Sequence, residues 1–317
     1  MGSGCSTMNN KRLKIVAFAI FRFVFIFGVA YIILEPLLTM ISMAFMRDID
    51  LFDRTVRFIP RHFTLNNFAD TIIYINYWEA LRNTAMLSFI VALLQAFSCV
   101  IVGYGFGFFN FRWKNLFFGL VIITMVVPPQ LIMTPLYLNF HNFTLFGIIP
   151  LFNDGEGLRL LGSFVPFVLI SITAVGPRNG LYIFLARQTF RGMPKEIAEA
   201  AAIDGAGPFR VFYRVLLPGA MPMMTAIFLF SFVWQWTDSL YSFMFVPNMV
   251  TLASMLSILP HRFAMMVLVQ TEAVGNLAYF SIITSTSILL TILPPLLIYA
   301  LFQKRFIQSI ERTGIVG

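Results

Sequence analysis

Charged residues are scarce in this sequence. Of its 317 residues only 11% are Asp, Glu, Lys or Arg, whereas a soluble domain averages about 25%. Hydrophobic residues make up 59%, and 37 residues are Phe. The apolar residues form continuous runs near the roughly 20 residues that a helix needs to cross a bilayer. Runs without alternation exclude a membrane β-barrel, so the sequence predicts membrane-spanning helices.

Cysteine and histidine are also scarce, which limits the chemistry available. Cys5 and Cys99 lie far apart in the sequence and are expected to be free thiols. His62, His141 and His261 are isolated from one another and from the cysteines, so no metal site is expected. The sequence contains no Gly-rich phosphate loop and no grouping of serine, histidine and acid typical of a hydrolase. We therefore expect neither an enzyme nor a chain with a cofactor of its own.

The apolar runs predict an all-α polytopic membrane protein with about six transmembrane helices. A prolyl pair at 128–129 is expected to interrupt the third helix, because proline removes a backbone donor and clashes with the preceding turn. The expected helices cover residues 15–46, 78–108, 116–140, 162–187, 213–237 and 276–302.

The basic residues predict the orientation of these helices. If the amino terminus is cytoplasmic, the inner segments hold thirteen Lys and Arg and the outer loops hold six. The bias of Lys and Arg toward cytoplasmic loops then places both termini and the loop at 188–212 inside. This topology accounts for the formal net charge of +8, so no nucleic-acid partner is expected.

One polar stretch, residues 194–222, stands out in this apolar background. Pro194 suits the first turn of a helix, and the residues from Lys195 to Ile203 are good helix formers. Gly205 stands where a helix commonly ends in a left-handed residue. The pattern predicts a short helix, a glycine turn and a second helix that begins near Phe209. The face with Ala198, Ala201 and Ala202 is small, so we expect another surface to approach it closely.

The spacing within this stretch resembles the EAA loop of binding-protein-dependent ABC importer permeases. The resemblance implies that this loop docks on a separate ATPase subunit and transmits its movement to the membrane helices. It also implies the type I ABC importer permease fold. The positions that match are Glu199, Ala200, Ala201, Asp204, Gly205, Ala206, Phe212, Leu217, Pro218 and Pro222.

Further motifs in residues 80–317 resemble carbohydrate-type permeases, in particular the second membrane subunit of maltose-type importers. Thr237 stands where the family usually has Asn, and the tail lacks its penultimate Lys. The resemblance divides the chain into an amino-terminal tail (1–14), a first helix with an outer loop (15–77), a permease core (78–303) and a cytoplasmic tail (304–317). The motifs are Phe184–Gln188, Val127–Gln130, Trp236–Asp238 and Phe306–Gly317.

The resemblance implies one subunit of an ATP-driven importer of a sugar, in particular an oligosaccharide, in a bacterial or archaeal cytoplasmic membrane. The implied partners are a homologous permease, two ATPase subunits that carry ATP and Mg, an extracytoplasmic binding protein, lipid and the sugar. Two alternatives stay open. One is the same importer class for another solute, such as an amino acid, a phosphate ester or a polyamine. The other is a stand-alone secondary transporter.

Polar residues within apolar helices suggest where solute passes, since such residues are costly in a membrane and tend to mark pathways or helix partners. For Arg178 the alternative is a structural role, either paired with a carboxylate or at a helix break at Gly176–Pro177. Glu35 lies beside a proline and is expected to be structural. The candidate substrate-path residues are Trp234, Gln235, Trp236, Asp238 and Arg178.

The segment at 247–273 follows the fifth predicted helix on the outer side. It is too polar to be a further full span, and we expect it to meet the binding protein. Pro260, His261 and Arg262 are expected to form a tip or bend of this docking loop. The alternative is a re-entrant or lateral helix that covers the bundle.

Overall fold

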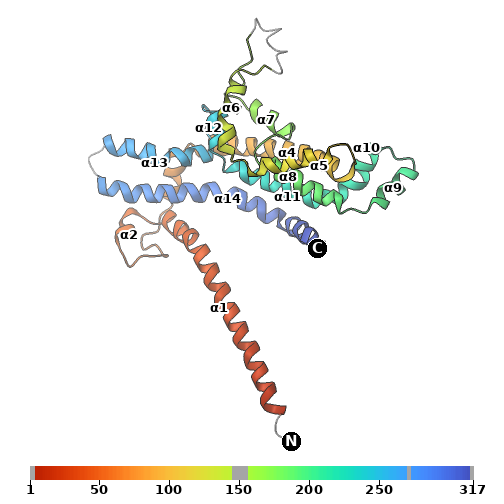
Figure 1. The fold of residues 1–317 in the computed structure, drawn as a ribbon. Coiled ribbons are helices and arrows are strands. Elements are labelled where there is room, and N and C mark those ends of the chain that lie inside the picture. Colours follow the sequence, from red (N-terminus) through yellow and green to blue (C-terminus); the bar gives the residue numbers. More distant parts are fainter. Residues whose placement is uncertain (1–3, 145–155, 270–272, 315–317) are drawn as a thin grey trace. The chain divides into compact units, whose positions relative to one another are not determined.

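The chain is mostly helical in the residues that its computed structural model describes, namely 4–144, 156–269 and 273–314. It divides into two compact units. The first unit combines residues 1–74 with 261–290, and the second combines 75–260 with 291–317. The elements, shown in Figure 1, are α1 (Gly4–Ala44), α2 (Asp48–Phe52), α3 (Asn66–Tyr74), α4 (Tyr77–Phe108), α5 (Lys114–Val126), α6 (Pro129–His141), α7 (Val165–Ile172), α8 (Asn179–Arg191), α9 (Lys195–Ile203), α10 (Pro208–Arg210), the π-helical turn η2 (Val211–Leu216), α11 (Leu217–Trp236), α12 (Leu240–Phe245), α13 (Leu252–Val269) and α14 (Ala273–Gly314).

In the first unit, the polar loop after α1 is held by buried hydrogen bonds. The Asp50 carboxylate accepts hydrogen bonds from the backbone N–H of His62 at 2.9 Å and from its Nδ1 at 2.6 Å. Burial raises the pKa of Asp50, but the hydrogen bonds from His62 outweigh it and hold the pKa below its usual value. Asn67 Nδ2 donates to the carbonyls of Ala44 and Met46. The loop is therefore a folded structure rather than a solvated connection.

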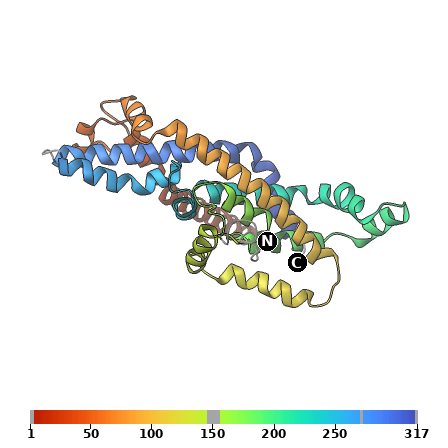
Figure 2. The same ribbon diagram turned by 90° about the horizontal axis from the view of Figure 1, so that it is seen from above.

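The core of the second unit is built from α4, α8 and α11, which lie side by side in Figures 1 and 2. Two glycines one turn apart allow α4 to approach α8 closely. A Cβ at Gly103 would lie 2.3 Å from the Ala186 Cβ, and one at Gly107 would lie 2.9 Å from the Phe190 Cβ. Small residues spaced by four are typical of tight helix contacts in membranes. The sequence thus brings the two backbones together where a larger residue would separate them.

Four helices in the described part of the chain are long and apolar enough to cross a membrane, or five if one bent pair counts as a span. The bent pair is α5 and α6, which meet at 102° where the sequence predicts an interruption by proline. About six spans were expected. The difference arises in the predicted helix at 162–187, which is split into α7 and α8. Neither piece is long enough to cross alone.

The predicted docking loop at 247–273 is instead largely the helix α13, so Pro260 does not lie at the tip of a loop. Thr251 and Ser254 cap the start of α13 with reciprocal hydrogen bonds between backbone N–H and hydroxyl groups. Pro260 lies inside the helix, and His261 and Arg262 are exposed beside it. Favourable capping and an apolar sequence keep this segment helical despite the proline.

Candidate functional site

The polar stretch at 194–222 folds as its pattern predicts. Pro194 directly precedes α9, which ends at Ile203. Gly205 follows with φ +83°, and its N–H donates to the Ala202 carbonyl while Ala206 N–H donates to the Ala201 carbonyl, each at 3.0 Å. This pair of bonds is the Schellman motif, in which a left-handed residue closes a helix. Gly205 is therefore the residue that turns the chain back after α9.

The return from this turn contains a π-helical segment that the sequence analysis missed. After α10 the chain continues through η2 and then α11, whose second residue is Pro218. Proline has no backbone N–H, and the wider π turn directly precedes it. Single π turns inside helices occur frequently at functional sites. Because Pro218 belongs to the matched pattern, it is the one sequence signal that marks this position.

Part of the small face of α9 packs on the chain itself, whereas Ala202 is exposed and remains accessible to another surface. Ala198 is buried in the same cluster as Tyr104 and Phe190, and Ala201 and Ala206 pack against that cluster. A concavity of about 330 Å³ lies along this contact and includes Glu199 among its lining residues. Alanine thus lets α9 lie close to the end of its own bundle.

The opposite face of α9 and its return carry two large apolar side chains that face outward. Ile203 is 87% exposed and Phe209 is 86% exposed. Glu199, Ala200 and Asp204 are exposed as well. The exposure of Ile203 and Phe209 was not predicted from the sequence, although the helical phase of the alanines places Ile203 on the outer face.

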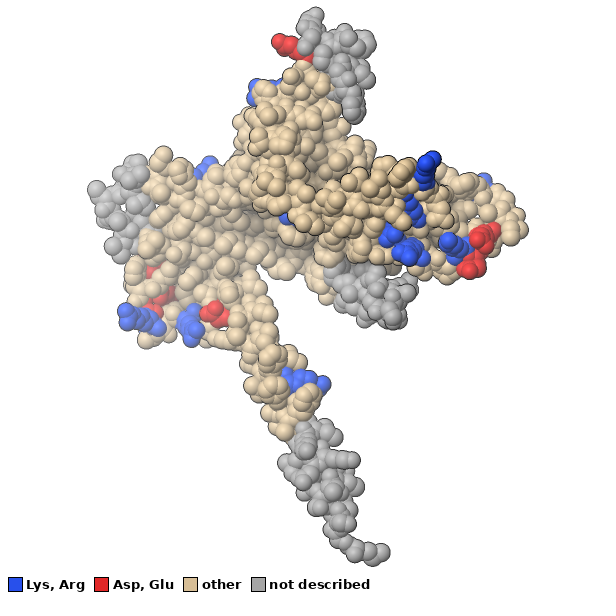
Figure 3. Space-filling view, viewed as in Figure 1, with Lys and Arg blue, Asp and Glu red and all other residues tan. Residues whose placement is uncertain are grey.

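The α9 segment projects beyond the end of the α4, α8 and α11 bundle in both ribbon views (Figures 1 and 2). Figure 3 shows that Lys and Arg gather around this end of the second unit, with Asp and Glu on the projecting tip. Ile203 and Phe209 on this projection are accessible to a partner. The geometry suits a docking element rather than a packed part of the bundle.

A second candidate site lies at the break between α7 and α8. Ala174 and Arg178 both have left-handed backbones, with φ of 56° and 68°, and they flank the Gly176–Pro177 pair. Such conformations are strained for residues with a side chain and cluster at functional positions. The sequence analysis had recognised a break here only as the alternative explanation of Arg178. The structure shows that the break and the exposed Arg178 side chain occur together.

Most of the predicted substrate-path residues line one cavity at this break. The Arg178 guanidinium lies 3.5 Å from the ring centre of Trp234, a cation–π arrangement. Gln235 and Asp238 line the same cavity, and no hydrogen-bond partner is found for Gln235 Nε2 among the described residues. The cavity volume is only about 30 Å³, which is room for a water molecule but not for a sugar.

Trp236 is the predicted path residue that the cavity does not include. Its side chain is 2% exposed, and its indole N–H donates to the Thr291 carbonyl at 2.9 Å. A buried tryptophan usually needs such a partner for its N–H. Trp236 therefore holds α11 against α14 rather than facing the cavity.

The other predicted candidates fall into separate places. Glu35 has Arg57 at 3.9 Å as an exposed ion-pair partner, which agrees with the structural role expected of it. Cys99 is a buried free thiol.

Within the residues that the structure describes, no group of three His, Cys, Asp or Glu side chains is placed to hold a metal. The predicted tail motif Phe306–Gly317 ends in residues 315–317, which lie outside the described part.

Long apolar helices, a bundle broken at its centre and a projecting polar loop define a multi-pass membrane permease. The chain belongs to the family described as binding-protein-dependent transport system inner membrane component, whose model matches residues 99–308. The chain is therefore the membrane-spanning component of such a transport system and not an enzyme.

Individual relatives agree with this assignment. The chain is 27% identical to the arabinooligosaccharides transport system permease protein AraQ of Halalkalibacterium halodurans, over 91% of this chain and 93% of that protein. It is 25% identical to the sn-glycerol-3-phosphate transport system permease protein UgpE of Escherichia coli O1:K1, over 90% and 92%.

A solved structure supports the fold in addition. A chain from a bacterial ABC transporter involved in the import of the acidic polysaccharide alginate superimposes with a TM-score of 0.69. The match covers 92% of this chain and 96% of that chain, at 19% identity. The type I importer permease fold expected from the sequence is thus confirmed.

Proposed function

We propose that this chain forms half of the translocation path of an ATP-driven importer of a sugar, in particular an oligosaccharide. It works with a homologous permease, two ATPase subunits that bind ATP and Mg, and an extracytoplasmic binding protein. Movement of the ATPase subunits reaches the membrane helices through residues 194–208. The observation that carries the proposal is the α9 segment, a closed helix–glycine–helix that projects from the bundle and exposes Ile203 and Phe209.

The contacts of α9 explain how it transmits movement. Ala198 is buried against the ends of α4 and α8, so α9 moves with the bundle rather than independently of it. The return through η2 leads directly into α11, and α11 carries Trp234 and Gln235 at the cavity. A displacement of the loop by a partner therefore acts on the helix that lines the solute path.

A substitution at the exposed apolar position tests this coupling role. In the reconstituted complex, Ile203→Asp should abolish most of the ATPase stimulation by loaded binding protein, because a buried unpaired carboxylate at the partner surface is costly. Ile203→Leu keeps an apolar contact of similar volume and should retain stimulation. Full stimulation in both variants, at equal assembly, would show that α9 is not the coupling element.

The nature of the solute rests on the relatives and on the cavity. An arabinooligosaccharide system is among the relatives, and the aromatic and polar side chains of Trp234, Gln235 and Asp238 are groups that suit sugars. Arg178 and the sn-glycerol-3-phosphate relatives favour the second candidate, a phosphate ester. The cavity holds about 30 Å³, so it must widen before either solute passes through it.

Uptake into proteoliposomes separates the solute candidates. We expect the complete complex with its binding protein to accumulate a labelled oligosaccharide only when ATP is supplied. Accumulation of sn-glycerol 3-phosphate instead would favour the phosphate-ester candidate. Uptake by this chain alone, without ATP and ATPase subunits, would favour a stand-alone secondary transporter and contradict the proposal.

Orientation and binding-protein docking complete the proposal. The excess of basic residues supports cytoplasmic placement of both termini and of the α9 segment. Pro260, His261 and Arg262 would then lie toward the outer face, where exposed side chains of α13 are available to the binding protein. Arg262 Nη1 lies 3.4 Å from the Tyr74 carbonyl, which holds this part of α13 against α3.

A further inference from the structure

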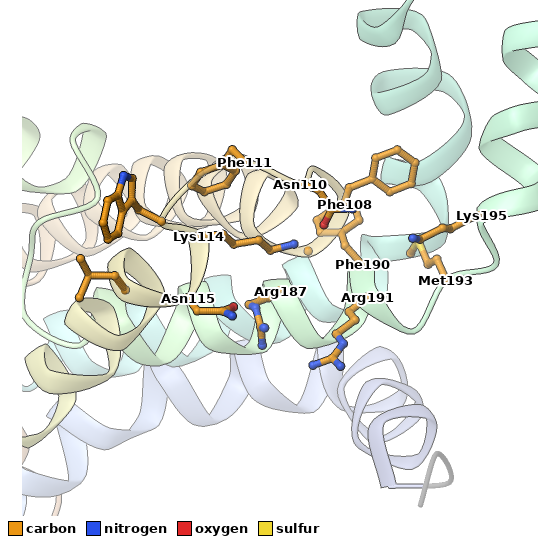
Figure 4. Close-up of a pocket in the computed structure, with 13 residues that line it drawn as sticks. Phe108, Asn110, Phe111, Lys114, Asn115, Arg187, Phe190, Arg191, Met193 and Lys195 are labelled. Carbon is orange, nitrogen blue, oxygen red and sulfur yellow. The ribbon is translucent and has the colours of Figure 1, made fainter.

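A large basic pocket lies beside the α9 segment, and Lys195 at the start of α9 is one of its lining residues. It has a volume of about 720 Å³ and is formed by the end of α4, the turn at 109–115, the end of α8 and the start of α9. Figure 4 shows Lys114 extending across it, with Arg187 and Arg191 on the facing helix and Lys195 at the end toward α9.

Four cationic side chains from three segments line this pocket, and none of its lining residues is acidic. No ion pair within the described residues joins Lys114, Arg187, Arg191 or Lys195 to a carboxylate. Arg187 and Arg191 lie four residues apart on one helix, where like charges destabilise each other. Among the described residues, the pocket thus concentrates positive charge without a carboxylate partner.

The positions of two of these groups are fixed. Lys114 Nζ donates to the Phe109 carbonyl at 2.7 Å, and the Arg187 guanidinium lies 3.9 Å from the ring centre of Phe118. No hydrogen-bond partner is found for the buried Arg187 Nε in the described part of the chain. Asn110 and Asn115 add amide groups to the same lining. Fixed cations with an unused donor are features of a built anion site rather than of a freely solvated surface.

The preference for basic residues in cytoplasmic loops accounts for their number at this end, but not for their arrangement. Basic residues distributed over the loops would satisfy that preference without forming a concavity. Here Gly107 brings the ends of α4 and α8 together, since a Cβ there would lie 3.1 Å from the Arg187 carbonyl oxygen. Close packing of these helices places the pocket walls and their charges opposite each other.

We propose that this pocket binds a phosphate group. Lys and Arg form short, strong hydrogen bonds to phosphate oxygens, and a group with one or two negative charges would offset the repulsion among the four cations. Two sources share this chemistry. One is the head group of an anionic phospholipid, and the other is a soluble phosphate.

The surroundings favour the lipid source. The pocket lies where the apolar spans of α4 and α5 end, which is the level of the lipid head groups. Phe111, Trp113 and Leu116 line it together with the cations, and tryptophan is enriched at membrane–water interfaces. Basic pockets between transmembrane helices on the cytoplasmic side are suited to phospholipid head groups. An occupant here would contact Lys195 at the start of α9 and so stabilise the loop that receives the ATPase.

Retention of lipid by the purified complex tests the proposal. Native mass spectrometry of the complete complex should show bound phosphatidylglycerol and little phosphatidylcholine after incubation with equal amounts of each. The Lys114→Gln/Arg191→Gln double variant should retain roughly tenfold less phosphatidylglycerol, because it removes two of the four cations. The charge-preserving Lys114→Arg/Arg191→Lys variant should retain it. The control Arg210→Gln/Arg214→Gln removes two exposed cations outside the pocket and should leave retention unchanged.

A second arm identifies the source of the phosphate. Inorganic phosphate is titrated against the complex in a lipid-free zwitterionic detergent, and binding is followed by ³¹P line broadening. Binding that depends on Lys114 and Arg191, without selective lipid retention, would assign the pocket to a soluble phosphate. If neither phosphatidylglycerol nor phosphate distinguishes the double variant from the Arg210/Arg214 control, the proposal is wrong.

Discussion

At the residue scale, Gly205 is the position where the sequence pattern, the backbone conformation and the proposed role in coupling are most directly linked. Its φ of +83° is a backbone conformation that glycine adopts readily and other residues resist. Gly207 is two residues away with φ −63°, and neither glycine has a neighbouring atom within 4 Å of a built Cβ. The two positions therefore differ in backbone conformation and not in available space.

This difference gives a matched prediction. Gly205→Ala should strain the turn by about 1–2 kcal/mol and reduce binding-protein-stimulated ATPase activity several-fold. Gly207→Ala should leave that activity nearly unchanged. Both variants are compared with the parent complex at equal expression and assembly. Equal activity of the two variants would show that the left-handed turn has no part in coupling.

Single residues also show the limits of reasoning from sequence. Gly205 and Arg178 were recognised because a fixed spacing or a charge in an apolar run marks them. Trp236 was placed on the solute path because aromatic side chains suit sugars, yet it is buried and bonded to Thr291. Ile203 was missed because one exposed apolar residue is not distinguishable from a core residue without its surroundings.

At the element scale, the approach of α4 to α8 depends on one face of small residues. Gly103 and Gly107 lie on this face, whereas a Cβ built at Gly105 would have no neighbouring atom within 4 Å. The sequence G-Y-G-F-G thus contains two glycines that packing requires and one that it does not.

We predict opposite effects of alanine at these neighbouring positions. Gly103→Ala places a methyl group 2.3 Å from Ala186 Cβ, and overpacking of this kind costs about 1–3 kcal/mol. Gly105→Ala should be neutral or stabilise the helix by about 0.5–1 kcal/mol. Thermal unfolding in detergent, followed by size-exclusion chromatography, measures both. A Gly103→Ala variant as stable as Gly105→Ala would contradict the packing described.

The ends and bends of helices were predictable where proline or glycine marks them, and less so where tertiary packing determines them. The bend between α5 and α6 follows from Pro128–Pro129. The Gly176–Pro177 pair offered a split of the predicted fourth helix only as an alternative, and no local pattern indicated the left-handed conformations of Ala174 and Arg178. Pro260 was expected to bend a loop but lies inside α13, because the capped, apolar helix tolerates it.

At the scale of the whole molecule, the family and the fold were predictable from one polar motif in an apolar chain. The family match over residues 99–308 confirms that assignment. What the sequence did not reveal is the direction of the α9 faces, since this depends on how α9 packs against α4 and α8. Ala198 and Ala201 face the chain itself, and Ile203 and Phe209 face outward.

The central claim is that the outward face of α9 contacts an ATPase subunit, and cross-linking tests it most directly. Ile203→Cys in the assembled complex should form a cross-link to the ATPase subunit with a short bifunctional reagent. Val175→Cys, also exposed at 72% but at the α7–α8 break, should not. Cross-linking from position 203 alone is the predicted result. No cross-link from position 203 in a complex that still hydrolyses ATP in response to binding protein would contradict the account.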